Sequence, residues 1–457
     1  MNRLMMGIIL AGVAGCTLTP PAPLTAPVPP PSAMTHALTP VEAPFPHDWW
    51  TRFGDSELTR LIELARTNNV DLAQAAARMD AARARARIAG ADAAVQVTGS
   101  ASALRQRTSE NTALQIGSDH TAQFGADLNF SYELDIWGRV KAARTAAEKE
   151  IALATFERNA AEISLLAQVA RNYLTLRALQ QEIAVIRTQI ARYTETEKLQ
   201  SVRVDSGFAT ELDLQRTRIE RASAEGECEQ LRQTERGYSI ALTLLCGLAA
   251  EVPVTGIFVD AGLKTPDVPQ HLSLAVLEAR PDVVARRVAW EAAAERLHVA
   301  QAERLPTLRL SGAIGYASQN PEDLLNWKSH LWSITAGLTA PLYDGGRLRG
   351  NQELMQAQLR EATSAYSAAM LTAYREVADA RSTLLALAEQ QHAATRVRDA
   401  AQRALALAHE RYEKGFATYL EVIESERSLL AAQRTLVRLE GGRNCATVDL
   451  VRALGWW

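Results

Sequence analysis

The stretch that decides the fold reads AQFGADLNFSYEL and spans residues 122–134. Every second side chain in it is apolar, and the side chains between them are polar or glycine. A period of two is that of a β-strand with one apolar and one polar face. Alternation also marks residues about 95–104, about 308–318 and about 331–343. Because a strand of ~9–11 residues crosses a bilayer, we predict four membrane-spanning strands.

Long helices follow the second and the fourth predicted strand. Residues 139–206 contain neither proline nor glycine, and residues 347–414 contain a single glycine. At ~1.5 Å per residue, each uninterrupted helix would be ~100 Å long. Gly207 and Gly415 follow these segments, and glycine favours a reversal because it adopts the left-handed conformation at a helix end. The two predicted helical hairpins span 139–247 and 347–455.

The chain is internally duplicated. Gly207-Phe208-Ala209-Thr210 recurs as Gly415-Phe416-Ala417-Thr418, and Gly138-Arg139 recurs as Gly346-Arg347, each 208 positions later. A constant offset over such a long stretch indicates two similar halves. Each half begins with a predicted helical segment, about 57–91 in the first and about 273–303 in the second. The predicted division is 47–250 for the first repeat, 251–272 for the linker and 273–457 for the second repeat.

The N-terminus has the features of a secretory signal. Arg3 precedes a short apolar run, and Val13-Ala14-Gly15-Cys16 resembles the bacterial lipoprotein box. We predict that residues 1–15 are removed and that Cys16 carries N-palmitoyl and S-diacylglycerol groups, which anchor the chain in lipid. Thr17 in place of Asp favours the outer membrane. The proline-rich residues up to 46 lack apolar side chains to bury, so 16–46 is predicted to be an extended tether.

Composition and motif searches exclude several classes of protein. The 49 basic residues are balanced by 52 acidic ones, which argues against a nucleic-acid binder. The histidines are scattered, and no Walker loop, G-x-S-x-G elbow or Cys-x-x-Cys pair is present. We therefore expect no enzyme, no catalytic residue, no metal ligand and no cofactor besides the lipid. Cys228, Cys246 and Cys445 are expected to be buried thiols, although a disulfide between two of them remains open.

Four amphipathic strands are too few to close a barrel. A bilayer does not tolerate open sheet edges, and the smallest outer-membrane barrels have about eight strands. Three copies of the chain would supply twelve strands around a water-filled lumen and twelve pseudo-continuous helices. The alternative is a soluble four-stranded sheet with coiled-coil arms, but the lipoprotein signal and the apolar strand faces favour the membrane.

Several short motifs together resemble the TolC-like outer-membrane factors, most closely their lipid-anchored OprM- and NodT-like branch. The resemblance implies an α+β membrane protein: a trimeric twelve-stranded outer-membrane β-barrel continuous with a long periplasmic α-helical barrel and a mixed equatorial domain. It also implies a Gram-negative outer-membrane location. The motifs are Trp49-Trp50 with Phe53-Gly54-Asp55, Glu133-Leu134-Asp135-Ile136-Trp137-Gly138-Arg139, Arg280-Pro281-Asp282-Val283, Pro341-Leu342-Tyr343-Asp344-Gly345-Gly346-Arg347 and Ala453-Leu454-Gly455.

The resemblance also implies a gate at the periplasmic tip of the helices. Glu421 and Glu424 match the family's acidic closing residues, and their spacing of three places them on one helix face. Threefold symmetry would turn them into carboxylate rings that attract cations, and Leu420 could form an apolar plug beside them. Tyr412 matches a closing residue that hydrogen-bonds an aspartate equivalent to Asp213. The alternative interpretations are a solvated face for the glutamates and simple packing for Tyr412.

These features predict the exit duct of a tripartite efflux system. The duct would be a passive trimer for drugs or other small toxic compounds, with a periplasmic adaptor docking near Gly207 and Gly415 and an RND-type pump in the inner membrane. Two alternatives remain: the outer-membrane component of a type I secretion system, or a lipid-anchored coiled-coil protein without a pore. The sequence does not identify the substrate.

Overall fold

The computed structural model describes residues 48–107, 120–249 and 274–455 of the chain. The predicted signal peptide 1–15, Cys16, the tether to residue 46 and the linker 251–272 lie outside these ranges. The chain divides into two compact units. Of the described residues, the first unit contains Arg78–Thr155 and Ala285–Ala368 except for the gap in β1–β2, and the second contains 48–77 together with the described parts of Phe156–Val284 and Ala369–Trp457.

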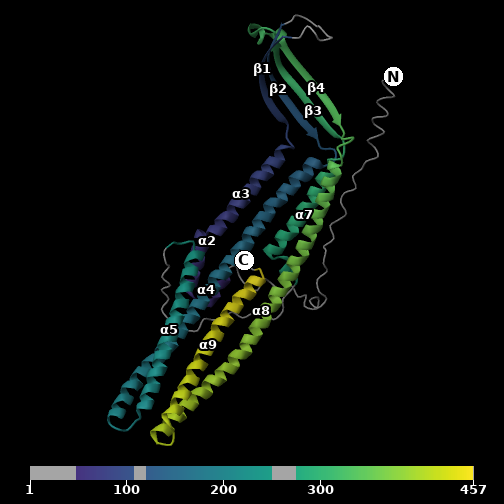
Figure 1. Ribbon diagram of the computed structural model, residues 1–457. Helices are drawn as coiled ribbons and strands as arrows, with labels where there is room; N and C mark the ends of the chain where they lie inside the picture. The colour runs from purple at the N-terminus through teal and green to yellow at the C-terminus, as the bar shows by residue number, and fades with distance from the viewer. Residues whose placement is uncertain (1–47, 108–119, 250–273, 456–457) are drawn as a thin grey trace. The chain divides into compact units, whose positions relative to one another are not determined.

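Helices dominate both halves of the chain, and each half contributes two strands (Figure 1). The two longest helices have 67 residues each, and the helices that return from them have 35 residues each. In chain order the elements are η2 Trp49–Phe53, α2 Ser56–Asn68, α3 Val70–Ala91, β1 Gln96–Arg107, β2 His120–Leu134, α4 Arg139–Asp205, α5 Glu211–Leu245, α6 Leu274–Glu278, α7 Pro281–Ala302, β3 Thr307–Ser318, η3 Pro321–Asp323, η4 Trp327–Ser329, β4 His330–Thr339, α8 Arg347–Glu413 and α9 Tyr419–Ala453.

The strands of the first unit form one antiparallel sheet in the order β1-β2-β3-β4, and Figure 1 shows them side by side in a curved layer. In the register, Phe130 of β2 lies opposite Val97 of β1 and Gly312 of β3, and Gly312 lies opposite Ile334 of β4. Because side chains alternate along each strand, this register places the apolar positions of all four strands on one face.

The strand bounds differ slightly from those expected. β1 extends to Arg107 rather than to about residue 104, because Leu104–Arg107 pair with His120–Gln123 of β2. β4 ends at Thr339 rather than at about residue 343. Pro341 follows Ala340, and proline has no N–H to donate to a ladder, which ends the pairing there.

Each helical segment that begins a repeat is interrupted once. Asn69 separates α2 from α3: its side-chain oxygen accepts the backbone N–H groups of Asp71 and Leu72, and its amide donates to the carbonyl of Leu245. The side chain thus starts a new helix and fixes the break to α5. In the second repeat, Pro281 opens α7, where its missing N–H costs no helical hydrogen bond.

The centre of the second unit is a core built around the tryptophan motif. Trp49, Trp50 and Phe53 are buried against α2 and against the middle of α4. Asp55 accepts the N–H groups of Glu57 and Leu58 at the start of α2, and its second oxygen accepts the hydroxyl of Tyr173 at 2.6 Å. One carboxylate therefore caps a helix and fixes it to α4.

The Arg-Pro-Asp motif fastens the end of the chain to the same unit. Arg280 is buried, donates to the carbonyl of Ala453 at 2.5 Å, and contacts Asp282 and Glu376 at 2.8 Å each. A Cβ on Gly455 would lie 2.5 Å from the Arg280 side chain. Among the described helices, none is long and apolar enough to cross a membrane.

Candidate gate and membrane-facing sheet

The two long hairpins reverse at glycines with matching geometry. Gly207 has φ 74° and Gly415 has φ 75°. The next residue in each, Phe208 or Phe416, donates its N–H back to the carbonyl of Arg203 or Arg411 at 2.7 and 2.8 Å. This is the hydrogen bond of a left-handed helix cap, which non-glycine residues adopt only with strain. Phe208 and Phe416 remain largely exposed, so the reversals present two aromatic rings to their surroundings.

The predicted gate residues lie on the first turns of α9, just after the second reversal. The side chains of Glu421 and Glu424 are 47% and 60% exposed. Glu421 lies 3.9 Å from Arg411 across the hairpin, and Glu424 lies 3.4 Å from Arg427. Leu420 is 40% exposed. Exposed charges paired this loosely contribute little to stability, so both carboxylates remain accessible to a second chain or to ions.

The hydroxyl of Tyr412 contacts two residues of α4. It accepts hydrogen bonds of 3.4 Å from Gln200 and Arg203. The carboxylate of Asp213 accepts the hydroxyl of Thr210 at 2.7 Å and lies 3.8 Å from Arg216. Neither set of contacts joins the two residues, so the predicted Tyr412–Asp213 hydrogen bond stays a prediction.

Tyr419 is the tyrosine that connects the second hairpin to α5. Its hydroxyl accepts a hydrogen bond of 3.3 Å from Thr217, and its ring lies 5.4 Å from that of Tyr412. Tyr419 is buried, and burial raises the pKa of its hydroxyl to about 12. The hydroxyl is therefore neutral around neutral pH and serves as a hydrogen-bonding group.

Ion pairs between the two hairpins were not predicted from the sequence. Glu182 of α4 is buried and accepts from Arg434 at 2.9 Å and from Arg438 at 2.6 Å. Burial alone would raise the pKa of Glu182, but the hydrogen bonds from the two arginines outweigh it and hold the pKa below its ordinary value. Farther along, Arg427 pairs with Glu220 and Arg434 pairs with Glu227.

A heptad spacing in the sequence could have revealed these pairs. Glu220 and Glu227 of α5 are seven residues apart, as are Arg427 and Arg434 of α9. A period of seven keeps residues on one seam of packed helices. Opposite charges repeating on two helices of equal length therefore indicate that the helices lie side by side.

The sheet of the first unit exposes an apolar face. Leu128, Phe130, Ile314, Trp332 and Ile334 lie on it and are 37–73% exposed. Val95, Leu310 and several of these residues border an apolar groove on that face. Soluble monomers rarely leave such a continuous apolar surface in water.

The opposite face of the sheet is polar. Asp127 accepts hydrogen bonds from Ser100 at 2.7 Å and from Asn129 at 2.5 Å, all on that face. Gly315 lies opposite Asp127, where a Cβ would approach the Asp127 backbone within 2.6 Å. The sheet thus has the two-faced character of a wall between lipid and water.

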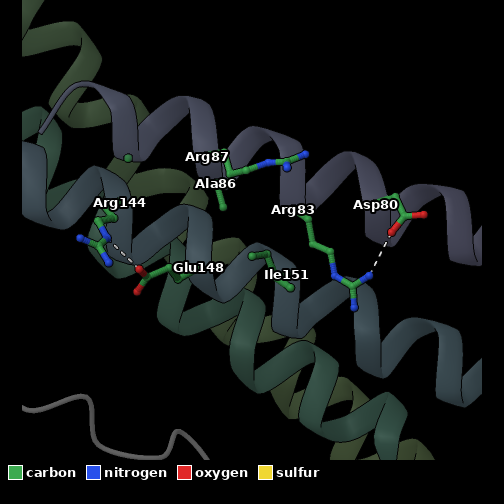
Figure 2. Close-up of a pocket in the computed structure, with 8 residues that line it drawn as sticks. Asp80, Arg83, Ala86, Arg87, Arg144, Glu148 and Ile151 are labelled. Carbon is green, nitrogen blue, oxygen red and sulfur yellow. Dashed lines mark hydrogen bonds and ion pairs between the residues drawn. The ribbon is translucent and has the colours of Figure 1, made fainter. Parts of the chain in front are cut away.

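A charged groove lies between α3 and α4 in the first unit (Figure 2). Figure 2 shows that its ion pairs form within each helix: Arg83 with Asp80 at 3.0 Å, and Arg144 with Glu148 at 2.8 Å. Such pairs are typical of solvated helix faces. In the described ranges, no three His, Cys, Asp or Glu side chains converge as a metal site, and Cys228, Cys246 and Cys445 are free thiols.

Comparison with known proteins agrees with this architecture. The chain is 31% identical over 412 residues to the pyoverdine export outer membrane protein OpmQ of Pseudomonas putida, covering 89% of this chain and 87% of that protein. It is 32% identical over 420 residues to outer membrane protein OprJ of Pseudomonas aeruginosa, covering 89% and 86%. The crystal structure of the outer membrane protein VceC from Vibrio cholerae superposes with a TM-score of 0.83 at 30% identity, covering 90% of this chain and 99% of VceC.

The family model of outer membrane efflux proteins matches residues 61–248 and 272–456, one segment in each repeat. The predicted resemblance to TolC-like outer-membrane factors, the fold class and the outer-membrane location are confirmed. The chain therefore belongs to the outer membrane efflux protein family and serves as the exit duct of an efflux system.

Proposed function

We propose that three copies of this chain close one barrel and one helical duct. The observation that carries the proposal is a sheet whose edge strands, β1 and β4, pair on one side only within the described ranges, and whose apolar face is exposed. In a bilayer each unpaired backbone group costs several kcal/mol, so the edges must pair. Because neighbouring strands alternate in direction, β4 of one copy can continue antiparallel into β1 of the next, and three copies give twelve strands.

The proposed gate is formed by the first turn of α9 in each copy. Threefold symmetry would place three Glu421 and three Glu424 carboxylates around one axis, next to Leu420. A ring of carboxylates in a narrow passage attracts cations and repels anions. The exposure of both carboxylates in the single chain supports this arrangement, because each forms only a loose, exposed ion pair and remains accessible.

The duct itself would do no chemistry. Energy would come from an inner-membrane RND-type pump, and a periplasmic adaptor would dock at the reversals of Gly207 and Gly415, where exposed Phe208 and Phe416 offer apolar contacts. The lipid on Cys16 would add a second anchor. OpmQ is named for pyoverdine export, which supports small exported compounds as the cargo of this duct as well.

Reconstitution tests this proposal directly. The purified full chain is expected to have the mass of a trimer by native mass spectrometry and to conduct ions in a planar bilayer. A monomer that never conducts would contradict the proposal and would favour the lipid-anchored coiled coil. An adaptor and an RND-type pump should co-purify with the trimer, whereas co-purification with an ABC exporter would indicate protein secretion instead.

A further inference from the structure

The buried stripe of α9 contains one carboxylate among apolar and aromatic side chains. Tyr419, Val422 and Leu429 are buried at spacings of three and seven, and Glu426 occupies the position between the last two. Glu426 is only 8% exposed. A glutamate is rarely buried this deeply unless a partner neutralises it.

Among the described residues, no lysine or arginine forms an ion pair with Glu426. Its Oε2 has no hydrogen-bond partner, and its Oε1 lies 3.9 Å from Nε2 of His409, beyond hydrogen-bond distance. The neighbouring Arg427 contacts Glu220 and Glu424 instead. The titratable and charged groups around the carboxylate are Arg192 and Tyr193 of α4, Glu220 of α5, His409 of α8, and Tyr419 and Arg427 of α9.

These surroundings favour the protonated form. Burial raises the pKa of Glu426 from its ordinary value of 4.5 to about 7; the charge of Arg192 opposes this rise and the negative charge of Glu220 adds to it. The protonated form fits the apolar stripe, whereas the ionised form leaves a charged oxygen buried and unpaired. Such a group is costly as long as the helices stay packed.

We propose that Glu426 is a positioning residue of the gate: proton binding at this buried carboxylate sets how tightly α9 packs on α4, α5 and α8, and thereby how readily the tip opens. The inference rests on the proposed function, because it takes the first turn of α9 as the gate. Glu426 lies two residues beyond Glu424, and Arg427 joins Glu424 to Glu220. A shift of α9 at Glu426 therefore moves the gate carboxylates with it.

The direction of the pH effect follows from linkage. The packed tip binds the proton with a pKa of about 7, whereas a released, solvated glutamate has its ordinary value of 4.5. Below pH 4.5 both states are protonated and the packed tip has its full stability. As pH rises from 4.5 to about 7, the equilibrium constant that favours the packed tip over the released one falls by up to about tenfold per pH unit and per chain. Above pH 7 this fall levels off.

The test is the open fraction of the full trimeric channel in a planar bilayer between pH 5 and 8. The wild-type open fraction is expected to rise between pH 5 and 7, by up to about tenfold per unit and per chain, and then to level off. Glu426→Gln mimics the protonated form at every pH, so its open fraction is expected to stay low and flat. Glu410→Gln, an exposed carboxylate near the same reversal, is the matched control and should keep the wild-type slope.

If the open fraction of Glu426→Gln still rises with pH, the proposal is overturned. If His409→Gln then abolishes this rise, the histidine is the titrating group. Hydrogen exchange of the α9 amides supplies a readout that needs no conduction. Compared at equal pH, wild type is expected to exchange faster than Glu426→Gln at pH 7.5 and equally fast at pH 4.5. A chain that never conducts would contradict the proposed duct, and the exchange comparison alone would then decide the role of Glu426.

Discussion

The two long hairpins have the same backbone plan and different charges. Helices of 67 and 35 residues joined by a left-handed glycine occur in both. Asp213 of the first hairpin corresponds to Glu421 of the second, and Arg216 corresponds to Glu424. Asp213 and Arg216 neutralise each other at 3.8 Å, whereas the second hairpin carries two carboxylates at the same places. The two repeats thus share the scaffold and differ in charge, and the charge of the proposed gate lies on one of them.

The two hairpins also carry opposite charges where they pack against each other. The first hairpin contributes the acceptors Glu182, Glu220 and Glu227, and the second contributes the donors Arg427, Arg434 and Arg438. The equivalent positions of the other repeat carry no charge: Glu220 and Glu227 correspond to Ser428 and Thr435, and Arg427 and Arg434 correspond to Ile219 and Gly226. The difference in charge therefore makes the hairpins complementary.

The largest expected effect comes from breaking this complementarity. Arg434→Ala combined with Arg438→Ala leaves the Glu182 carboxylate buried without its donors, which costs about 3–5 kcal/mol. A large fall in the temperature at which purified protein loses helical circular dichroism is expected. Arg349→Ala is the control: its pair with Glu353 is exposed, so its loss should cost only about 0.3–0.5 kcal/mol. Equal effects of the two changes would contradict the role assigned to the buried pairs.

The reversals should respond equally, because their geometry matches. Gly207→Ala and Gly415→Ala each force a side chain into the left-handed region, at about 1–2 kcal/mol. No atom lies within 4 Å of the added Cβ in either case, so packing adds nothing. Thermal unfolding checks this, with Gly350→Ala in the first turn of α8 expected to stabilise by at most about 1 kcal/mol. Clearly unequal losses at the two reversals would show that one turn is held by its surroundings.

The smallest effect separates the two helix caps. Thr210 caps α5 by accepting the N–H of Asp213, whereas Thr418 makes no side-chain cap at α9. Thr210→Ala should cost about 1 kcal/mol, and Thr418→Ala should cost almost nothing. Faster amide exchange in the first turn of α5, with no change in that of α9, is the expected measurement. A loss at Thr418 as large as at Thr210 would show that its hydroxyl has another partner.

The sequence predicts the elements well because their signals are local. Strand alternation, the absence of proline and glycine in the long helices, and the repeated glycines depend on neighbouring residues only. Asn69 was missed because its effect on the helix depends on a distant carbonyl, that of Leu245. The ion pairs of Glu182 and the burial of Glu426 were missed because they depend on how separate helices pack. The predicted gate residues came from the family resemblance, and the contacts of Tyr412 with Gln200 and Arg203 depend on how α8 packs on α4.

The second hairpin carries the charge that we propose selects ions at the gate. The most direct test of this claim is the reversal potential of single channels in a salt gradient across a planar bilayer. The double variant Glu421→Gln with Glu424→Gln is expected to lose the cation preference of the wild type. Arg216→Ala, which releases the charge of Asp213 on the first hairpin, is expected to increase it. An unchanged reversal potential in the double variant would contradict the account.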